Sequence, residues 1–253
     1  MEKHILDLLV TKVEAPASAF VLLRMRPVEG RMPTCLPGQF AQLRIDAPGV
    51  FLRRPISIHD IHDDEISFLV QVVGQGTRWL ASLKPGDRVN AVLPLGNGFT
   101  IPQPGTNVLL VGGGVGVAPL YFLGRSLKAE SLRPTFLLGA RTRDALLCLD
   151  AFQALGEVFV TTEDGSLGER GFVTQHSVLG ERRFDLVQTC GPTPMMKAVA
   201  RYAGEQGIPC EVSLENRMAC GVGACLCCVQ ETQEGHKCVC TDGPVFNVDE
   251  LKW

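Results

Sequence analysis

Apolar and polar residues follow two different rhythms along the chain, and the rhythm changes near residue 102. Before that point, short apolar runs are separated by Pro-Gly and Asp-containing turns, a pattern typical of antiparallel strands. Strands are predicted at residues 10–15, 19–27, 39–46, 53–60, 65–73 and 87–93, and only residues 77–83 have a helical pattern. Short strands at this interval predict an antiparallel β-barrel over residues 1–101.

Residues 102–212 alternate apolar strands with helical stretches, after a Pro/Gly-rich boundary at residues 102–105. Strands are predicted at residues 107–113, 134–140, 157–163 and 184–191, and helices at 118–130, 144–156 and 194–207. This alternation predicts a parallel α/β sheet. Residues 213–253 then form a small cysteine-containing lobe that is too short to bury a core by itself.

The spacing of the cysteines in this lobe indicates a metal centre. Cys220, Cys225, Cys228 and Cys240 follow the C-x₄-C-x₂-C…C pattern of a plant-type [2Fe–2S] site. Small residues between the first two cysteines allow the backbone to wrap a cluster and donate amides to sulfur. Structural zinc usually takes paired C-x₂-C knuckles. Adjacent cysteines at 227 and 228, with no secretory segment, argue against disulfides.

Two glycine-containing turns follow apolar strands in the α/β half. Such turns allow a nucleotide phosphate to approach the backbone at the start of a helix, at the carboxyl ends of the strands. The strict G-x-G-x-x-G pattern is not met, so the first turn alone is equally consistent with a simple strand–helix connection. The candidate nucleotide-binding residues are Gly112, Gly113, Gly114 and Gly116 in the first turn, and Cys190, Gly191, Pro192 and Met195 in the second.

Polar residues that suit a flavin and a nicotinamide nucleotide occur outside these turns. In the RRPIS segment at 53–57, an arginine fork can bind a pyrophosphate and a serine hydroxyl can reach a flavin nitrogen; two exposed strand arginines are the alternative. Residues 74–77 lead into the short helix as a second possible pyrophosphate cradle. Asp164 follows a predicted strand, where a carboxylate bonds ribose hydroxyls and repels a 2′-phosphate, which favours NAD over NADP; an acidic turn is the alternative.

Composition narrows the class of protein. The chain has 253 residues, 45% of them hydrophobic, and its net charge of −3 provides no basic surface for nucleic acid. Residues 89–124 carry no charge, but several prolines prevent them from forming one membrane-spanning helix. With no signal-peptide pattern, we expect a soluble cytoplasmic protein. The motifs of hydrolases and phosphoryl-transfer enzymes are absent from the sequence, and we expect no catalytic acid, base or nucleophile.

Taken together and in order, several motifs resemble the ferredoxin-reductase superfamily. More narrowly, the chain resembles the iron–sulfur electron-transfer subunit of class 1B dihydroorotate dehydrogenase over essentially its whole length. Residues 215–221 and 242–246 are the most specific part of the match. The motifs are RRPIS, GQGT, VGGGVGVAPL, EDGSLGERG, CGPTPMM and CGVGACLCC followed by CTDGPVF.

The resemblance implies FAD in the barrel, NAD in the α/β part and a [2Fe–2S] cluster held by Cys220, Cys225, Cys228 and Cys240. It also implies that Cys190 lies beside the nicotinamide. Ile56 replaces the aromatic residue of the superfamily pattern, and relatives often carry a basic residue where Gln71 stands. The spacing leaves the roles of the cysteines at 227 and 238 open. The implied FAD contacts are Arg54, Pro55, Ile56, Ser57, Leu69, Val70, Gln71, Gly76 and Thr77.

The implied function is electron transfer in pyrimidine biosynthesis. Electrons would pass from the FMN of a catalytic partner subunit through the cluster and FAD to NAD⁺, in a heterotetramer with two copies of each chain, with the cluster loop facing the partner. A close rival is the NADPH–ferredoxin oxidoreductase subunit of a bifurcating complex. From a different class, a zinc-binding or redox-sensing interaction module is the alternative.

Overall fold

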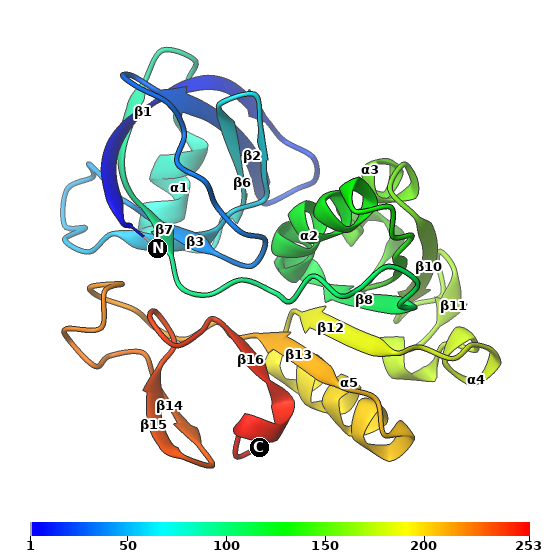
Figure 1. Ribbon diagram of the computed structural model, residues 1–253. Helices are drawn as coiled ribbons and strands as arrows, with labels where there is room; N and C mark the ends of the chain where they lie inside the picture. Colours follow the sequence, from blue (N-terminus) through cyan, green and yellow to red (C-terminus); the bar gives the residue numbers. More distant parts are fainter. Residues whose placement is uncertain (1) are drawn as a thin grey trace.

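The computed structural model describes residues 2–253, in which a curled antiparallel sheet precedes a parallel α/β sheet and a cysteine lobe (Figure 1). The first sheet has seven strands in the order β4-β3-β7-β1-β2-β6-β5, every pair antiparallel. Its strands are β1 (His4–Glu14), β2 (Phe20–Pro27), β3 (Phe40–Leu43), β4 (Arg54–Ser57), β5 (Asp60–His62), β6 (Glu65–Gln71) and β7 (Arg88–Leu95), and helix α1 (Gln75–Ala81) packs against them.

Strand pairing explains where the barrel differs from the sequence prediction. β1 begins at His4 rather than at residue 10, because its first residues pair with β7. The strand predicted at residues 53–60 is divided into β4 and β5. Between them the chain changes its pairing partner. The Ile58 amide still donates to the carbonyl oxygen of Gln39, next to β3, but the His59 amide donates to the carbonyl oxygen of Ser67 in β6. Alternating residues such as Leu23 and Met25 fill the barrel core.

The second sheet also has seven strands, in the order β11-β10-β9-β8-β12-β13-β16, and all but β16 are parallel. Its strands are β8 (Val108–Gly113), β9 (Thr135–Ala140), β10 (Glu157–Thr162), β11 (Glu169–Arg170), β12 (Leu186–Cys190), β13 (Cys210–Ser213) and β16 (Val245–Asn247). The helices are α2 (Val117–Ala129), α3 (Leu149–Gln153), α4 (Val178–Glu181) and α5 (Thr193–Gln206).

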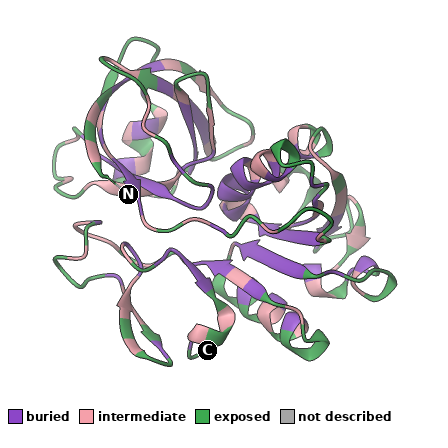
Figure 2. Ribbon diagram, viewed as in Figure 1, coloured by how far each residue is buried: buried purple, intermediate pink, exposed green. Residues whose placement is uncertain are grey.

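Helices cover both faces of the parallel sheet, because alternate strand residues point to opposite sides. Leu109 and Val111 of β8 belong to the core under α5, whereas Leu110 packs with α2 and α3. Figure 1 shows α2 and α5 on opposite sides of the sheet, whose central strands are coloured as buried in Figure 2. The helix predicted at residues 144–156 is wrong in its length. Cys148 adopts a left-handed conformation with φ of 56°, so α3 begins only at Leu149.

The cysteine lobe is joined to both sheets. Its hairpin consists of β14 (Val229–Thr232) and β15 (Gly235–Cys238), but its last strand, β16, pairs with β13 at the edge of the α/β sheet. Val239 and Phe246 of the lobe share a core cluster with Phe40 of the barrel. None of the helices in the described part of the chain has both the length and the apolar character needed to cross a membrane.

Candidate functional site

One cavity of about 750 Å³ is lined by residues of the barrel, the α/β sheet and the cysteine lobe. The α/β part contributes Gly116 and Cys190, and the lobe contributes Met218 and Cys227. The barrel contributes every residue predicted to contact FAD, namely Arg54, Pro55, Ile56, Ser57, Leu69, Val70, Gln71, Gly76 and Thr77. The structure therefore brings the complete predicted FAD set to one place.

The two neighbouring arginines of β4 and its preceding loop lie in different surroundings. The guanidinium of Arg53 donates to the Asn90 carbonyl oxygen at 2.9 Å and to the Asn90 side chain, so it ties neighbouring strands together. Arg54 lies beside α1, where a Cβ atom added at Gly76 would come within 2.8 Å of its Nε. Both arginines line the cavity, but Arg53 is engaged with Asn90, whereas the Arg54 guanidinium donates to the Leu52 carbonyl oxygen in the adjoining loop at 2.8 Å. This position suits the phosphate role predicted for Arg54.

The turn before α1 is organised around one hydroxyl group. The amides of Val73 and Gly74 donate to Thr77 Oγ1 at 2.9 and 3.0 Å, so these two amides are engaged within the turn. Val73, 72% exposed, and Leu52, also exposed, present apolar surface at the cavity wall. An apolar wall with a guanidinium and hydroxyl groups fits a flavin nucleotide.

Sequence reasoning missed some of the cavity wall. Phe40, Leu52 and Val73 line it, but none was predicted. In the sequence, Phe40 is one apolar residue of an alternating strand, and nothing distinguishes it from a core residue. The available signal for Leu52 and Val73 was an apolar residue within a turn, next to the RRPIS and GQGT motifs.

The predicted nucleotide turns meet at the carboxyl ends of β8 and β12. Gly112 is paired with Cys190 in the sheet, and a Cβ atom at Gly116 would lie 2.4 Å from the Cys190 carbonyl oxygen. A Cβ atom at Gly113 would lie 2.5 Å from Met195 Sδ. The two turns therefore touch at Gly116, where backbone leaves no room for a side chain, and at Gly113, where a side chain would displace Met195. The residues brought together are Gly112, Gly113, Gly116, Cys190, Gly191, Pro192 and Met195, with Gly114 facing open space.

Asp164 lies apart from this cavity. It follows β10, two strands from β8, and its Oδ1 accepts hydrogen bonds from the hydroxyl and the amide of Ser166 at 2.6 and 3.0 Å. These bonds, the hydroxyl bond first, lower the pKa of the Asp164 carboxyl group. An ionised carboxylate at this edge of a parallel sheet suits the ribose role predicted for it.

The four predicted cluster cysteines form two pairs. Cys225 hydrogen-bonds to Cys220 Sγ through its amide at 3.4 Å and through its side chain. Cys240 is bonded in the same two ways to Cys228, with its amide 3.4 Å from Cys228 Sγ. Among residues 2–253, no group of three His, Cys, Asp or Glu side chains is placed to hold a metal ion. Two pairs of thiols suit a dinuclear cluster, in which each iron takes two cysteines.

Backbone amides stabilise the thiolate form of Cys220 in the first of these pairs. The Val222 amide donates to Cys220 Sγ at 3.4 Å, and this bond is the largest cause that lowers the pKa of Cys220 to about 6. Burial raises the pKa of Cys240 to about 12, although the Gly223 amide donates to its Sγ at 3.2 Å. The loop thus offers the amide donors that iron–sulfur sites use.

The neighbouring cysteines at 227 and 228 lie in different environments. Cys228 is buried beside Cys240, whereas Cys227 is exposed and lines the cavity. This difference agrees with the prediction that the two do not ligate the same cluster. Cys238 donates its amide to Asp242 Oδ2 at 2.7 Å, and burial raises the pKa of its thiol.

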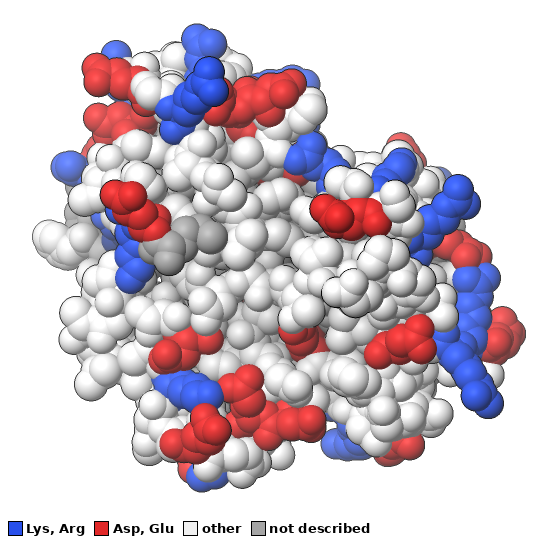
Figure 3. All heavy atoms as spheres, viewed as in Figure 1, with Lys and Arg blue, Asp and Glu red and all other residues white. Residues whose placement is uncertain are grey.

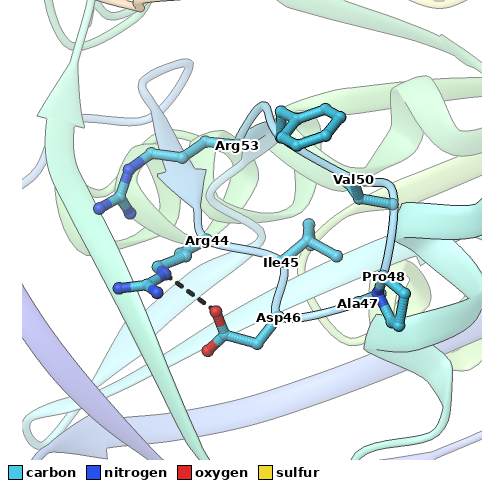
Figure 4. Close-up of a pocket in the computed structure, with 8 residues that line it drawn as sticks. Arg44, Ile45, Asp46, Ala47, Pro48, Val50 and Arg53 are labelled. Carbon is cyan, nitrogen blue, oxygen red and sulfur yellow. Dashed lines mark ion pairs between the residues drawn. The ribbon is translucent and has the colours of Figure 1, made fainter.

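A second hollow of about 700 Å³ lies in the loop between β3 and β4 (Figure 4). It contains none of the predicted site residues, and its Arg44 and Asp46 form an exposed ion pair at 2.9 Å. On the face that Figure 3 shows, Lys and Arg side chains are interspersed with Asp and Glu rather than gathered into one patch.

Comparison with solved structures defines the class of protein. The chain superposes on a structure described as an NADH-dependent reduced ferredoxin-NADP oxidoreductase, with a TM-score of 0.86 and 36% identity over 97% of this chain and 90% of that chain. The ferredoxin reductase of carbazole 1,9a-dioxygenase shares the fold, with a TM-score of 0.70 and 24% identity over 83% of this chain and 68% of that chain. Fold and site together define a ferredoxin-reductase-type oxidoreductase with sites for a flavin, a nicotinamide nucleotide and an iron–sulfur cluster.

Sequence comparison narrows this class to one family. Residues 215–252 match the iron–sulfur cluster binding domain of dihydroorotate dehydrogenase B, and residues 110–201 match the oxidoreductase NAD-binding domain. The dihydroorotate dehydrogenase B (NAD(+)) electron transfer subunits of Caldanaerobacter subterraneus and Shouchella clausii are 44% and 43% identical, over 85% of this chain and 86% of each relative. The chain belongs to this family of electron transfer subunits, which confirms the predicted resemblance, fold class and cofactors.

Proposed function

We propose that this chain is the electron-transfer subunit of an NAD-dependent dihydroorotate dehydrogenase. It accepts electrons from the FMN of a catalytic partner subunit and passes them through a [2Fe–2S] cluster and FAD to NAD⁺ in pyrimidine biosynthesis. The names and identity of the relatives support this proposal. The observation that carries it is the single cavity shared by the FAD set, the nucleotide turns and the cysteine lobe.

The residues of the chain bind and orient cofactors rather than act as acids or bases. Arg54 and Ser57 hold the flavin on the barrel side, while Gly116 and Cys190 admit the nicotinamide from the other side. Cys227 and its neighbours in the cavity wall bring the cluster loop to the same flavin. When bound, a flavin exchanges a hydride with a nicotinamide and single electrons with an iron–sulfur cluster.

The partner and its arrangement follow from the same assignment. We infer a complex of two copies of each chain, in which the cluster loop faces the FMN-containing subunit. Two apolar side chains of that loop, Val222 and Leu226, are 42% and 63% exposed and available for contact. None of the ten cysteines forms a disulfide, which suits the reducing cytoplasm that we infer for this protein. We place the domain boundaries after residues 101 and 212.

The preference for NAD over NADP rests on the position of Asp164. Its carboxylate follows β10 and is held ionised by Ser166, so it would bond ribose hydroxyls and repel a 2′-phosphate. We expect NADH to bind more tightly than NADPH in a titration of the flavin-loaded protein. Tighter binding of NADPH would contradict this part of the proposal.

Reconstitution with the partner tests the function. The chain is prepared anaerobically with its cofactors and mixed with the FMN-containing catalytic subunit, dihydroorotate and NAD⁺. We expect NADH to form only when both subunits are present, and to form more slowly when NADP⁺ replaces NAD⁺. A cofactor-loaded chain that binds the partner but yields no NADH would refute the proposal.

A second candidate function is the NADPH–ferredoxin oxidoreductase subunit of a bifurcating complex. The 36% identity with a solved structure of that description favours it. In that case NADPH would reduce the flavin-loaded chain, and the complex that contains the chain would reduce ferredoxin. Dihydroorotate and the FMN subunit would then give no turnover, so the same preparation distinguishes the two functions.

A further inference from the structure

Strand β3 has one face inside the barrel and the other toward the cysteine lobe. Ala41 and Leu43 belong to the barrel core, whereas Phe40 packs in the core cluster that contains Cys228 and Cys240. Because alternate strand residues share a face, Gln42 points to the same side as Phe40. A glutamine therefore lies on the barrel surface that the cluster loop covers.

The side chain of Gln42 is buried without a hydrogen-bond partner. Its exposed fraction is 0%, and neither Nε2 nor Oε1 finds a partner within the described chain. Its backbone carbonyl is occupied separately, by Arg53 Nη1 at 3.2 Å. Buried amide groups are almost always paired, and Gln42 differs from the equally buried Gln188, which lacks a partner at Oε1 but has partners at Nε2. With both atoms unpaired, the Gln42 amide is available to a group bound to the protein.

The unpaired amide lies against the cluster loop. A Cβ atom at Gly221 would stand 2.7 Å from Gln42 Cγ and 2.9 Å from Gln42 Nε2. Gly221 directly follows the predicted ligand Cys220 and has φ of 73°, so glycine is needed both for this close approach and for the backbone conformation. The loop that carries the first ligand thus passes directly over the glutamine amide.

Gln42 also lies next to the flavin strand. In the sheet it is paired with Pro55 of β4, which lines the cavity assigned to FAD. The residue therefore stands between the flavin wall on one side and the cluster loop on the other. Gln42 thus contacts both parts: its backbone pairs with β4, and its side chain lies against the Cys220 loop.

We propose that Gln42 is a positioning residue for the cluster, with its Nε2–H group donating a hydrogen bond to sulfur at the Cys220 end. The inference rests on the proposed function, because it requires a cluster held by the four cysteines. A donor to cluster sulfur stabilises the reduced form, which carries more negative charge, and so raises the reduction potential. Gln42 would thereby set the potential of the cluster beside the flavin.

Substitution of Gln42 by methionine tests this role, because methionine keeps the length and burial of the side chain but removes the donor. In the holoprotein, an EPR-monitored redox titration should show the equilibrium constant for cluster reduction falling roughly tenfold, which is about 59 mV for a one-electron couple. Gln188→Met is the matched control, since Gln188 is equally buried but donates to Thr100 and Glu211. The reduction potential of the cluster in Gln188→Met should equal that of the wild type.

A second measurement on the wild-type holoprotein decides the case if Gln42→Met fails to fold or to load iron. With nitrogen-15 placed only in glutamine side chains, pulsed EPR of the reduced cluster should detect a nitrogen-15 coupling. Absence of that coupling would overturn the proposal. An iron-loaded Gln42→Met protein with unchanged potential would overturn it as well.

Iron and sulfide analysis separates this proposal from the proposed function. Wild-type protein that binds no iron under anaerobic reconstitution would refute the cluster and the function together. Wild-type protein that loads iron and yields NADH with the partner, but whose cluster potential does not respond to Gln42→Met, would refute only the role of Gln42.

Discussion

Neighbouring residues of the same type have different roles in this chain. Successive side chains of an extended segment point to opposite faces. The Arg53 guanidinium therefore donates to Asn90 of β7 while Arg54 lies beside α1, and Cys228 is buried beside Cys240 while Cys227 is exposed. In the RRP and LCC motifs, neighbouring residues of one type consequently make different contacts.

The pairing of the cluster cysteines gives a prediction at this scale. Cys225→Ser removes one thiolate from a pair, so we expect the reconstituted protein to lose most of its iron. Cys227→Ser changes another exposed cysteine of the same loop, and this protein should keep its iron. Iron, sulfide and flavin analysis measures both. Full iron in Cys225→Ser, or none in Cys227→Ser, would show that the ligand assignment is wrong.

Arg54 gives a second prediction. Arg54→Met should weaken FAD binding about tenfold to hundredfold, because a hydrogen bond to a charged group contributes about 1.5–3 kcal/mol. Arg44→Met removes the same charge from the barrel, but at the exposed pair with Asp46 (Figure 4), and should leave FAD binding unchanged. Flavin fluorescence titration of the two apoproteins measures the difference. Equal affinities would exclude Arg54 from the flavin site.

At the scale of elements, the two nucleotide turns depend on each other. The turn after β8 and the turn after β12 belong to segments far apart in sequence, yet they touch at Gly116 and Cys190. Parallel neighbours in the sheet end at the same edge, so their following turns meet there. The second turn therefore requires a glycine at position 116, whether or not a phosphate is bound.

Gly116→Ala tests this contact. The added methyl group would lie 2.4 Å from the Cys190 carbonyl oxygen, and overpacking of this kind costs about 1–3 kcal/mol. We expect NADH to bind about tenfold to hundredfold more weakly, measured by titration of the FAD-loaded protein. Gly204→Ala is the matched control, because nothing lies within 4 Å of a Cβ atom there, and it should bind NADH normally. Normal binding by Gly116→Ala would contradict the expectation.

At the scale of the whole molecule, a small polar interface holds the barrel against the α/β part. His59 Nδ1 donates to the Ala118 carbonyl oxygen at 3.1 Å, and its ring stacks on Tyr121 with centroids 4.8 Å apart. Asp60 pairs with Arg125 at 2.8 Å beside them. Because Ala118 lines the cavity, this interface helps set the distance between its two walls.

The buried histidine makes stability depend on pH. Burial lowers the pKa of His59 to about 4 from an ordinary value of 6.5. Between these values the unfolded chain binds a proton that the folded chain does not, so the free energy of unfolding falls as pH decreases from about 6.5 to about 4. His59→Phe keeps an aromatic ring against Tyr121 that does not titrate. Its melting temperature should therefore fall less than that of the wild type between pH 6.5 and pH 4. Parallel curves for the two proteins would contradict the assignment.

The parts of the site that depend on residues close together in sequence could be predicted, and the parts that depend on long-range contacts could not. The cysteine spacing, the RRPIS segment and the glycine turns are local signals, because each turn or loop needs its residue types within a few positions. The contact of Phe40 with the lobe and the unpaired amide of Gln42 had no such signal. Both depend on which face of β3 the lobe covers, and strand pairing decides that.

By itself, the sequence determined the two rhythms of strands and helices, the family, the cofactors and a set of barrel residues that proved to line one cavity. Backbone periodicity and short motifs are properties of adjacent residues, so they can be read along the chain. Only the tertiary structure decided that β16 completes the α/β sheet, that the cysteines form two pairs and that one cavity is shared by all three parts. These features join residues far apart in sequence, and packing of the whole chain is what brings them together.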